Sequence, residues 1–388
     1  MIYFDNAATT RVYDDVVREM IPYFTEKYGN PSSICELGKE AKRAIEEARS
    51  KVASLINCEP DEVYFTSGGS ESDNMAIKGV ANMARRGHII TSKIEHSAVI
   101  HSCQNLERKG FRVTYLDVDK DGMVDLEQLK KAIRNDTILI SIMFANNEIG
   151  TIEPIYEISK IAKMYNIIFH TDAVQACGNV PIDVKKMGID MLSMSGHKLH
   201  APKGTGALYI RKGIRLDKHI DGGHQEGDKR AGTENVPGIV GLGKACEIAN
   251  EELGDNMRIL KELRDYYVMQ VENSIPNAKL NGSRNMRLPG NANFSFRGMD
   301  GRGMVIELNK RGICVSGGSA CSAGSTKASH VLKALGIPDE LTKSAIRTTF
   351  EPDNTKEDID YTIDNLKEIV AHLRSMSPLY EDFMRKQK

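Results

Sequence analysis

The strongest constraint on the fold of this chain is an alternation of short apolar runs with amphipathic segments between residues 62 and 211. The apolar runs are rich in β-branched residues, as in "GHIITS" and "TILISIMFA", whereas "IYEISKIAKMYN" repeats its apolar residues at helical spacing. Strands that alternate with helices build a largely parallel sheet, because two parallel neighbours need a long crossover connection. We therefore predict an α/β domain with a mainly parallel sheet.

The pattern changes after residue 233. Two amphipathic stretches over 236–253 and 257–275 predict long helices, and the strand candidates "NANFSFR" and "ICVSGG" follow them, with further helices near the end. This order indicates a smaller α+β domain. We predict a large domain over residues 15–255 and a small domain that combines residues 1–14 with residues 256–388.

The charge pattern argues against nucleic acid and membranes as partners. The 52 Lys and Arg residues nearly balance the 53 Asp and Glu residues, and neither sign forms a long block. Such a chain lacks the charged surface that attracts nucleic acid or an anionic membrane. The opening "MIYFDNAATT" has no signal-peptide apolar region, and no run of about 18 apolar residues suggests a membrane span. We therefore expect a cytoplasmic protein.

Polar residues directly follow several of the predicted strands. Gly68 and Gly69 permit a tight turn after "EVYF", and Ser70 can cap the helix that follows. Corresponding positions after the next strands are held by Glu95 and His96, by Asn146, Asn147 and Glu148, and by Asp172 and Gln175. Each such residue alone is usually a satisfied loop residue, but ligands bind beyond the carboxyl ends of parallel strands. Together these clusters predict a ligand site at one sheet edge.

The stretch "SMSGHKLHAPKG" places Lys198 just past another predicted strand. Partial burial and neighbouring cations lower the pKa of a lysine toward the reactive amine, although a lone loop lysine is usually solvated. Pyridoxal phosphate requires a turn for its phosphate, an acid for its pyridinium nitrogen and a lysine for its aldehyde, and Ser70, Asp172 and Lys198 supply these three parts. We predict Lys198 as the reactive lysine and Lys203 as a turn residue at the rim.

A series of motifs then identifies a family. In order they are "YFDNAATT", "YGNPSS", "FTSGGSESDN", "EHSAV", "NNEIG", "TDAVQ", "SGHKLHAPKGTGALY", "RAGTENV" and "SGGSACSAG". Through them the chain resembles a group I cysteine desulfurase of the NifS/IscS type, within the class-V aminotransferase-like, fold-type-I pyridoxal-phosphate enzymes. The resemblance implies a homodimer that binds pyridoxal phosphate and converts L-cysteine to L-alanine. It also implies transfer of the sulfur to an acceptor protein, such as an iron–sulfur scaffold.

The resemblance implies a role for each matching residue. Lys198 would bind the cofactor and move the Cα proton, and His96 would stack on the ring and assist that transfer. Arg347, together with Asn147, would hold the substrate carboxylate, a task suited to a guanidinium fork. The other implied cofactor-binding residues are Asp172 for the ring nitrogen, Gln175 for the ring hydroxyl, Ser70, Ser195 and His197 for the phosphate, Thr233 reaching across from the second subunit, and Gly69 and Asn147 beside them. No metal is implied.

Cys321 lies among glycine, serine and alanine in "VSGGSACSAGS", a composition that predicts a mobile loop. By resemblance, its thiolate would take the sulfur of the substrate and become a persulfide. The seven cysteines are scattered and contain no C-x-x-C pair, so neither a disulfide framework nor a zinc site is expected. An unpaired cysteine is usually buried, which we expect of Cys103, Cys177, Cys246 and Cys314.

Two other functions remain open from the sequence. A selenocysteine lyase or a related β-eliminating lyase would use the same lysine on another substrate. A scaffold protein on a degenerate enzyme fold is disfavoured because Lys198, Asp172 and Cys321 are all present. Two stretches depart from the family pattern: Gly227 and Asp228 stand where Arg-Gly is customary, and Glu351 and Pro352 stand where a small residue and glycine are customary.

Overall fold

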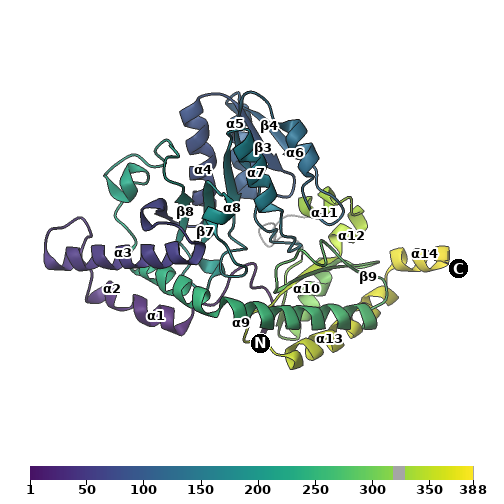
Figure 1. Ribbon diagram of the computed structural model, residues 1–388. Helices are drawn as coiled ribbons and strands as arrows, with labels where there is room; N and C mark the ends of the chain where they lie inside the picture. The colour runs from purple at the N-terminus through teal and green to yellow at the C-terminus, as the bar shows by residue number, and fades with distance from the viewer. Residues whose placement is uncertain (318–327, 388) are drawn as a thin grey trace.

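A seven-stranded sheet forms the centre of the larger part of the molecule (Figure 1). The computed structural model describes residues 1–317 and 328–387. The strand order is β2 (Val63–Thr66), β8 (Gly206–Ile210), β7 (Met191–Ser195), β6 (Ile168–Asp172), β5 (Thr137–Ser141), β3 (His88–Ser92) and β4 (Arg112–Leu116). The strands from β7 to β4 pair in parallel, and β8 is antiparallel to both of its neighbours. The predicted α/β fold with a mainly parallel sheet is confirmed.

Helices cover both faces of this sheet, and alternate strand residues show which face each core occupies. Ile89 packs with α4 (Gly69–Ala84) and α5 (Ser97–Arg108), whereas its neighbour Ile90 belongs to the core on the other face. That second face is covered by α3 (Glu36–Ile56), α7 (Ile155–Met164) and the first half of α9 (Val236–Ser274). Because successive side chains of a strand point to opposite faces, a doubly covered strand must be apolar throughout. The continuous apolar runs of the sequence reflect this burial.

One continuous helix, α9, replaces the two helices predicted between residues 236 and 275. Its first part, from Val236 to Cys246, packs in the core of the large sheet, and its second part, from Leu260 to Val271, packs in a separate core. Gly254 is the single glycine between these parts, and a glycine inside a helix costs only about 1 kcal/mol, so the helix continues through it. The domain boundary predicted at residue 255 falls inside this helix and stays a prediction.

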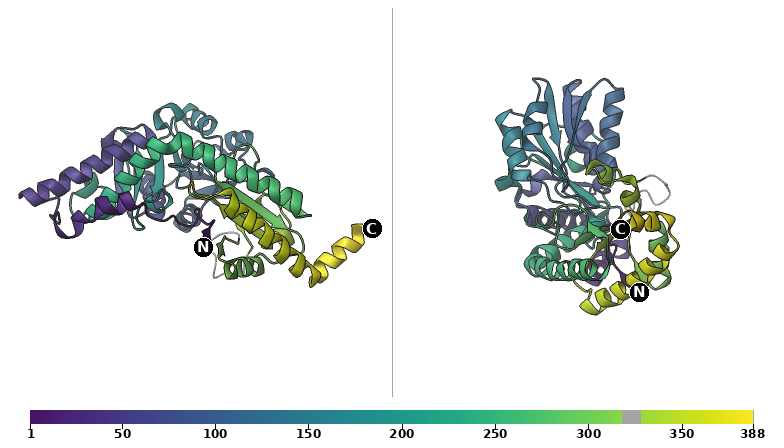
Figure 2. Two further views of the ribbon diagram at one scale, coloured as in Figure 1. Left: turned by 90° about the horizontal axis from the view of Figure 1, so that it is seen from below. Right: turned by 90° about the vertical axis from the view of Figure 1, so that its right-hand side faces the viewer.

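The second core surrounds a smaller sheet. Its antiparallel strands are β12 (Ala345–Thr349), β10 (Asn291–Phe296) and β9 (Ala278–Leu280). A two-stranded pair joins β1 (Ile2–Tyr3) to β11 (Ile313–Cys314) in parallel. The helices around it are α10 (Gly301–Lys310), α12 (Asp339–Lys343), α13 (Lys356–Ser375) and α14 (Pro378–Gln387). The short α11 (His330–Ala334) packs with α12 in a separate apolar cluster that also contains Ile94 and Met143. Figure 2 shows α13 running beside the second half of α9, with α14 projecting beyond its end.

The N-terminal segment connects the two cores. Phe4 is buried in the core of the smaller sheet, whereas Val16, on α1 (Asp14–Met20), is buried in the core of the larger one. The residues between them therefore cross from one core to the other. After α2 (Pro22–Thr25), the chain enters α3, and the connections of the large sheet include α6 (Leu126–Ala132) and α8 (Val184–Met187).

The described cysteines are all free thiols. Cys103, Cys177 and Cys246 are buried as predicted, and Cys58 is buried as well. Cys314 was also predicted to be buried, but it is only half-buried because its strand, β11, pairs with the short β1 alone. Within residues 1–317 and 328–387, no helix is both long and apolar enough to cross a membrane.

Candidate active site

The carboxyl ends of the parallel strands open into one cavity of about 540 Å³. This is the position that the polar clusters of the sequence predicted, because parallel strands all end at the same sheet edge. The predicted site residues that line the cavity are Gly69, Ser70, His96, Asn147, Asp172, Gln175, Ser195, His197, Lys198 and Arg347. The structure therefore brings together residues that lie far apart in the chain.

The turn between β2 and α4 forms one wall of the cavity. Gly68 has a φ of +148°, a conformation that side chains rarely allow, and a Cβ on Gly69 would lie 2.5 Å from Cγ2 of Val174. Both positions therefore require glycine, and the backbone amides at the start of α4 lie at the cavity, where an anion is favoured. The prediction that Ser70 caps this helix is wrong. The N-cap position is Gly68, so Ser70 already lies in the first helical turn.

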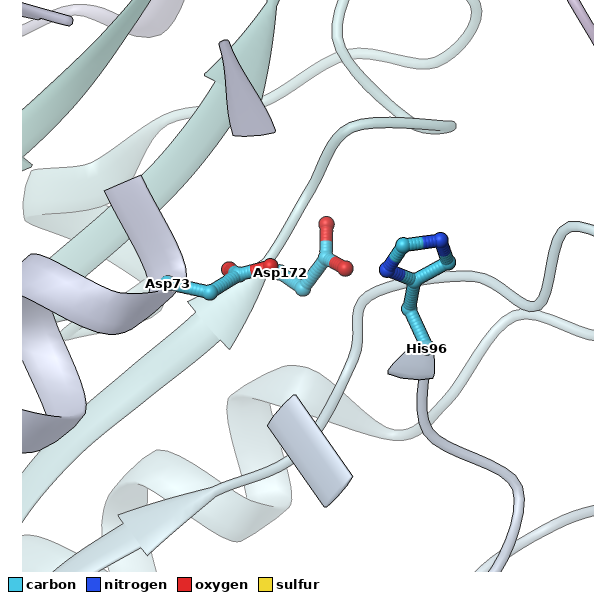
Figure 3. Close-up of side chains that lie close together, drawn as sticks. All are labelled: Asp73, His96 and Asp172. Atoms are coloured by element: carbon cyan, nitrogen blue, oxygen red, sulfur yellow. The ribbon is translucent and has the colours of Figure 1, made fainter. Parts of the chain in front are cut away.

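Two carboxyl groups and an imidazole meet deeper in the cavity (Figure 3). Asp172 ends β6, and its Oδ1 accepts a hydrogen bond from the backbone N–H of Val174 at 3.0 Å. Burial raises the pKa of Asp172, while the nearby His96 and Lys198 act to lower it. Asp73, on α4, is 1% exposed, and its Oδ1 lies 3.8 Å from Nε2 of the buried His170. Burial and the charge of Asp172 raise the pKa of Asp73 well above its usual range.

Sequence reasoning missed Asp73, although a signal for it was present. It lies in the buried stripe of α4 together with Ala76, Ile77 and Val80, so an acid occupies a position where the helical pattern expects an apolar residue. Ligand atoms of Asp73, His96 and Asp172 all lie within 4.8 Å of one another, a spacing that could hold a cation. The positive charge of Lys198 in the same cavity disfavours a bound cation. Our expectation that the protein binds no metal stays a prediction.

Lys198 ends the short 3-10 helix η2 (Gly196–Lys198), which directly follows β7. Its Nζ donates hydrogen bonds to the backbone oxygens of Ala7 and Ala8, each at 2.5 Å. Burial and the positive charges of Lys198 and Lys203 lower the pKa of the neighbouring His197 to about 4, so that imidazole is neutral at pH 7. A neutral imidazole can contribute a hydrogen bond to an anion here but no full charge.

The N-terminal segment, defined here as residues 5–10, forms a second wall that sequence reasoning did not assign to the site. Nε2 of Gln175 donates a hydrogen bond to the backbone oxygen of Ala7 at 3.1 Å, and Nδ1 of His197 lies 3.1 Å from Oγ1 of Thr9. Ala7, Ala8 and Thr9 line the cavity. The available signal was the small polar run "DNAATT" directly after the apolar start of the chain.

Arg347 reaches the cavity from the smaller sheet. It lies on β12, is 1% exposed, and donates from Nη1 to the backbone oxygen of Asn147 at 2.9 Å. Its Nη2 lies 2.7 Å from Oδ1 of Asp5, with which it forms a partly buried ion pair. Its Nε has no hydrogen-bond partner within the described part of the chain. Arg347 and Asn147 therefore lie in contact, and their role in holding a substrate carboxylate stays a prediction.

The family model described as "Aminotransferase class-V" matches residues 2–362. The chain belongs to this family. A relative named Cysteine desulfurase IscS, from Dictyoglomus turgidum, is 54% identical, and the match covers 100% of this chain and 99% of the relative. Another protein of that name, from Methanosarcina thermophila, is 55% identical over 97% of this chain and 94% of its own length. A solved structure titled NifS-like protein matches with a TM-score of 0.90 and 42% identity, covering 96% of this chain and 99% of that one.

Two predicted residues of this class-V aminotransferase lie outside the arrangement just described. Thr233 is exposed and is not among the residues that line the cavity of the described chain. Cys321 lies outside the described residues, which resume at 328. Lys203 lies in a turn at the cavity lining, in agreement with the prediction of a turn residue at the rim.

Proposed function

We propose that this class-V aminotransferase is a cysteine desulfurase, which converts L-cysteine to L-alanine and passes the sulfur to its own Cys321. The observation that carries the proposal is the 54% identity over the whole chain with a relative of that name. The cavity supports it, because a lysine, a buried aspartate and a buried arginine line one space. These are the groups needed to bind a cofactor aldehyde, a ring nitrogen and a substrate carboxylate.

We infer that pyridoxal phosphate is the cofactor, and the donor set of the cavity fits it. The glycine turn and the start of α4, with Ser70, Ser195 and His197, would hold the phosphate. Asp172 would meet the ring nitrogen, and Lys198 would hold the aldehyde end. When bound, pyridoxal phosphate supplies an electron sink for bond breaking at the substrate carbons.

The protein's own groups would position the substrate and move its protons. Arg347 would bind the substrate carboxylate, since a guanidinium fork matches a carboxylate in geometry and charge. Lys198, half-buried beside that position, would accept and return the Cα proton. His96 accepts a hydrogen bond at Nδ1 from the backbone N–H of Ala98 at 3.2 Å, which orients the ring and puts the proton of a neutral imidazole on Nε2.

The sulfur of the substrate would be transferred to the thiol of Cys321. Its thiolate attacks the substrate sulfur, the carbon–sulfur bond breaks as a sulfur–sulfur bond forms, and the substrate carbon takes up a proton and is released as alanine. The protein then carries a persulfide, which a thiol of an acceptor protein can take over. An iron–sulfur scaffold or another carrier of sulfur would be such an acceptor.

We also propose that the chain forms a homodimer, which would let Thr233 reach the second site. Support comes from large apolar side chains that are exposed between residues 17 and 37, on α1, on α2, in the connections after each of them and at the start of α3. They are Val17, Ile21, Phe24, Tyr28, Ile34 and Leu37. A monomer rarely exposes so many apolar groups in one short region, so this region fits a contact between copies.

Measurement of products tests the proposed function directly. The purified protein, loaded with pyridoxal phosphate, is expected to form alanine from L-cysteine and, with a reductant present, an equal amount of sulfide. Cys321→Ser is expected to retain the absorbance of the bound cofactor but to form no persulfide. Cofactor binding without alanine would refute a desulfurase, and a faster reaction with selenocysteine than with cysteine would favour a selenocysteine lyase.

A further inference from the structure

The ion pair between Asp5 and Arg347 joins residues 342 positions apart and is set by backbone pairing. Asp5 forms a parallel bridge with Thr349, whose Oγ1 also accepts a hydrogen bond from the backbone N–H of Ala7 at 2.9 Å. Arg347 precedes Thr349 by two residues on β12, so both side chains lie on the same face of that strand. The carboxylate of Asp5 is therefore held beside the guanidinium by the register of the chain.

The two partners differ in their access to the cavity and to water. Arg347 lines the cavity and its side chain is 1% exposed, whereas the side chain of Asp5 is 19% exposed and is not among the described residues of the cavity lining. The carboxylate of Asp5 accepts a hydrogen bond from one N–H group of the guanidinium, and the backbone oxygen of Asn147 accepts one from another. The guanidinium plane is thereby fixed, and its remaining donors, including Nε, can bind an incoming carboxylate.

We propose that Asp5 is a positioning residue that orients Arg347 and offsets its charge, so that it sets the affinity of the site for carboxylates. This inference rests on the proposed function, in which Arg347 binds the substrate carboxylate. A buried guanidinium without a counter-ion would be costly in the empty site and would hold any small carboxylate tightly. With Asp5 beside it, a substrate carboxylate meets an ion pair that is already neutral, and its binding is weaker.

The variant Asp5→Asn separates orientation from charge. The asparagine side-chain oxygen can still accept the hydrogen bond from Nη2, but the negative charge is lost. The backbone oxygen of Asp5, which accepts from the Tyr3 hydroxyl at 3.2 Å and from the Ala8 N–H at 2.9 Å, is unchanged, so the N-terminal segment keeps these contacts. A role in orientation alone predicts no change in carboxylate affinity, whereas loss of the offsetting charge predicts tighter binding.

Propionate is a suitable probe because it carries a carboxylate but neither an amine nor a thiol. Its inhibition constant against L-cysteine is measured on the loaded enzyme, and its stabilising effect on the melting temperature is measured with and without cofactor. In Asp5→Asn, we expect propionate to bind about fivefold tighter or more, with a lower KM for L-cysteine, since removal of one charge at this distance strengthens the attraction. Asp14→Asn, in an exposed pair with Arg11, is the matched control and should behave as wild type.

Each outcome decides the inference. Unchanged or weaker propionate binding in Asp5→Asn would overturn it, while the proposed function would stand if Arg347→Lys still raised the KM for L-cysteine. An Arg347→Lys variant with unchanged KM would instead refute the carboxylate site itself. If Asp5→Asn does not fold, Asp5→Ser provides a second neutral acceptor with the same expected direction. Failure of both variants to fold would show that Asp5 is purely structural and would also overturn the inference.

Discussion

Asp73 and Asp172 place two buried carboxyl groups close together beside His96, at the carboxyl end of β6. Two like charges this close in a buried site do not both ionise easily, and burial raises the pKa of each. Asp172 has a hydrogen bond from a backbone N–H and lies near two basic groups, His96 and Lys198. The basic neighbour of Asp73 is His170, whose pKa burial lowers to about 3, so it carries no charge that would favour an ionised Asp73. We therefore predict that Asp73 is the member of the pair that keeps its proton.

This assignment predicts different effects for the same substitution at the two positions. Asp73→Asn replaces a neutral acid by a neutral amide of the same shape, so we expect kcat to stay within about threefold of wild type. Asp172→Asn removes the charge proposed to face the ring nitrogen, and we expect a loss of about 100-fold or more, the scale of one strong electrostatic contact. The rate of alanine formation at saturating L-cysteine measures kcat for both variants. An equally large loss of kcat in the two variants would mean that Asp73 is ionised in the active protein.

Lys198 and Lys203 provide a matched test for the covalent lysine, since both line the cavity. Borohydride treatment of the loaded protein should fix the cofactor to Lys198, and mass spectrometry of the digested chain locates it. Lys198→Ala should lose this label together with measurable alanine formation, while Lys203→Ala should keep both. A label that persists in Lys198→Ala would assign the chemistry to another lysine.

Gly69 is expected to contribute to phosphate binding by keeping the turn before α4 in place. In Gly69→Ala, the new Cβ would lie 2.5 Å from Cγ2 of Val174, so the turn or Val174 must move. We expect cofactor affinity, measured by absorbance titration, to fall about tenfold or more, because the backbone amides shift with the turn. Gly254→Ala is the control, since that Cβ meets nothing within 4 Å, and helix propensity predicts a gain of about 1 kcal/mol in stability. Unchanged affinity in Gly69→Ala would contradict the assignment.

Stability should depend on pH through Glu153, whose pKa burial raises from 4.5 to about 8. The unfolded chain loses this proton near its ordinary pKa, while the folded protein keeps it, so the free energy of unfolding falls as pH rises between these values and levels off above about 8. Glu153→Gln should flatten the fall by at most about 1.4 kcal/mol per pH unit. Urea unfolding at several pH values measures the free energy of unfolding of the wild type and the variant, and the exposed Glu127→Gln is the control. A slope equal to that of wild type would show that Glu153 is already ionised.

The exposed apolar region between residues 17 and 37 predicts the oligomeric state. Light scattering should give the mass of a dimer, and Phe24→Asp should shift it toward the monomer, because Phe24 is 60% exposed and a charge at a buried contact is costly. Met164→Asp, at a 74% exposed position on α7, should leave the mass unchanged. A monomeric wild-type protein would contradict the proposed homodimer.

The sequence alone determined the features that depend on local patterns. The alternation of strands and helices follows from side-chain periodicity, which each segment carries by itself. The positions of Asp172, Gln175 and Lys198 follow from one further rule, that polar residues after parallel strands meet at one edge. The motifs of the chain also sufficed to identify its family.

Contacts between residues far apart in the chain depend on the tertiary fold. The pairing of Asp5 with Arg347 depends on closing a loop of more than 300 residues, and nothing near either residue signals the other. Asp73 lies in the site because α4, which follows the turn at Gly68, places one of its faces beside Asp172. The continuity of α9 likewise depends on the two cores that its halves occupy, since packing outweighs the weak local cost of Gly254.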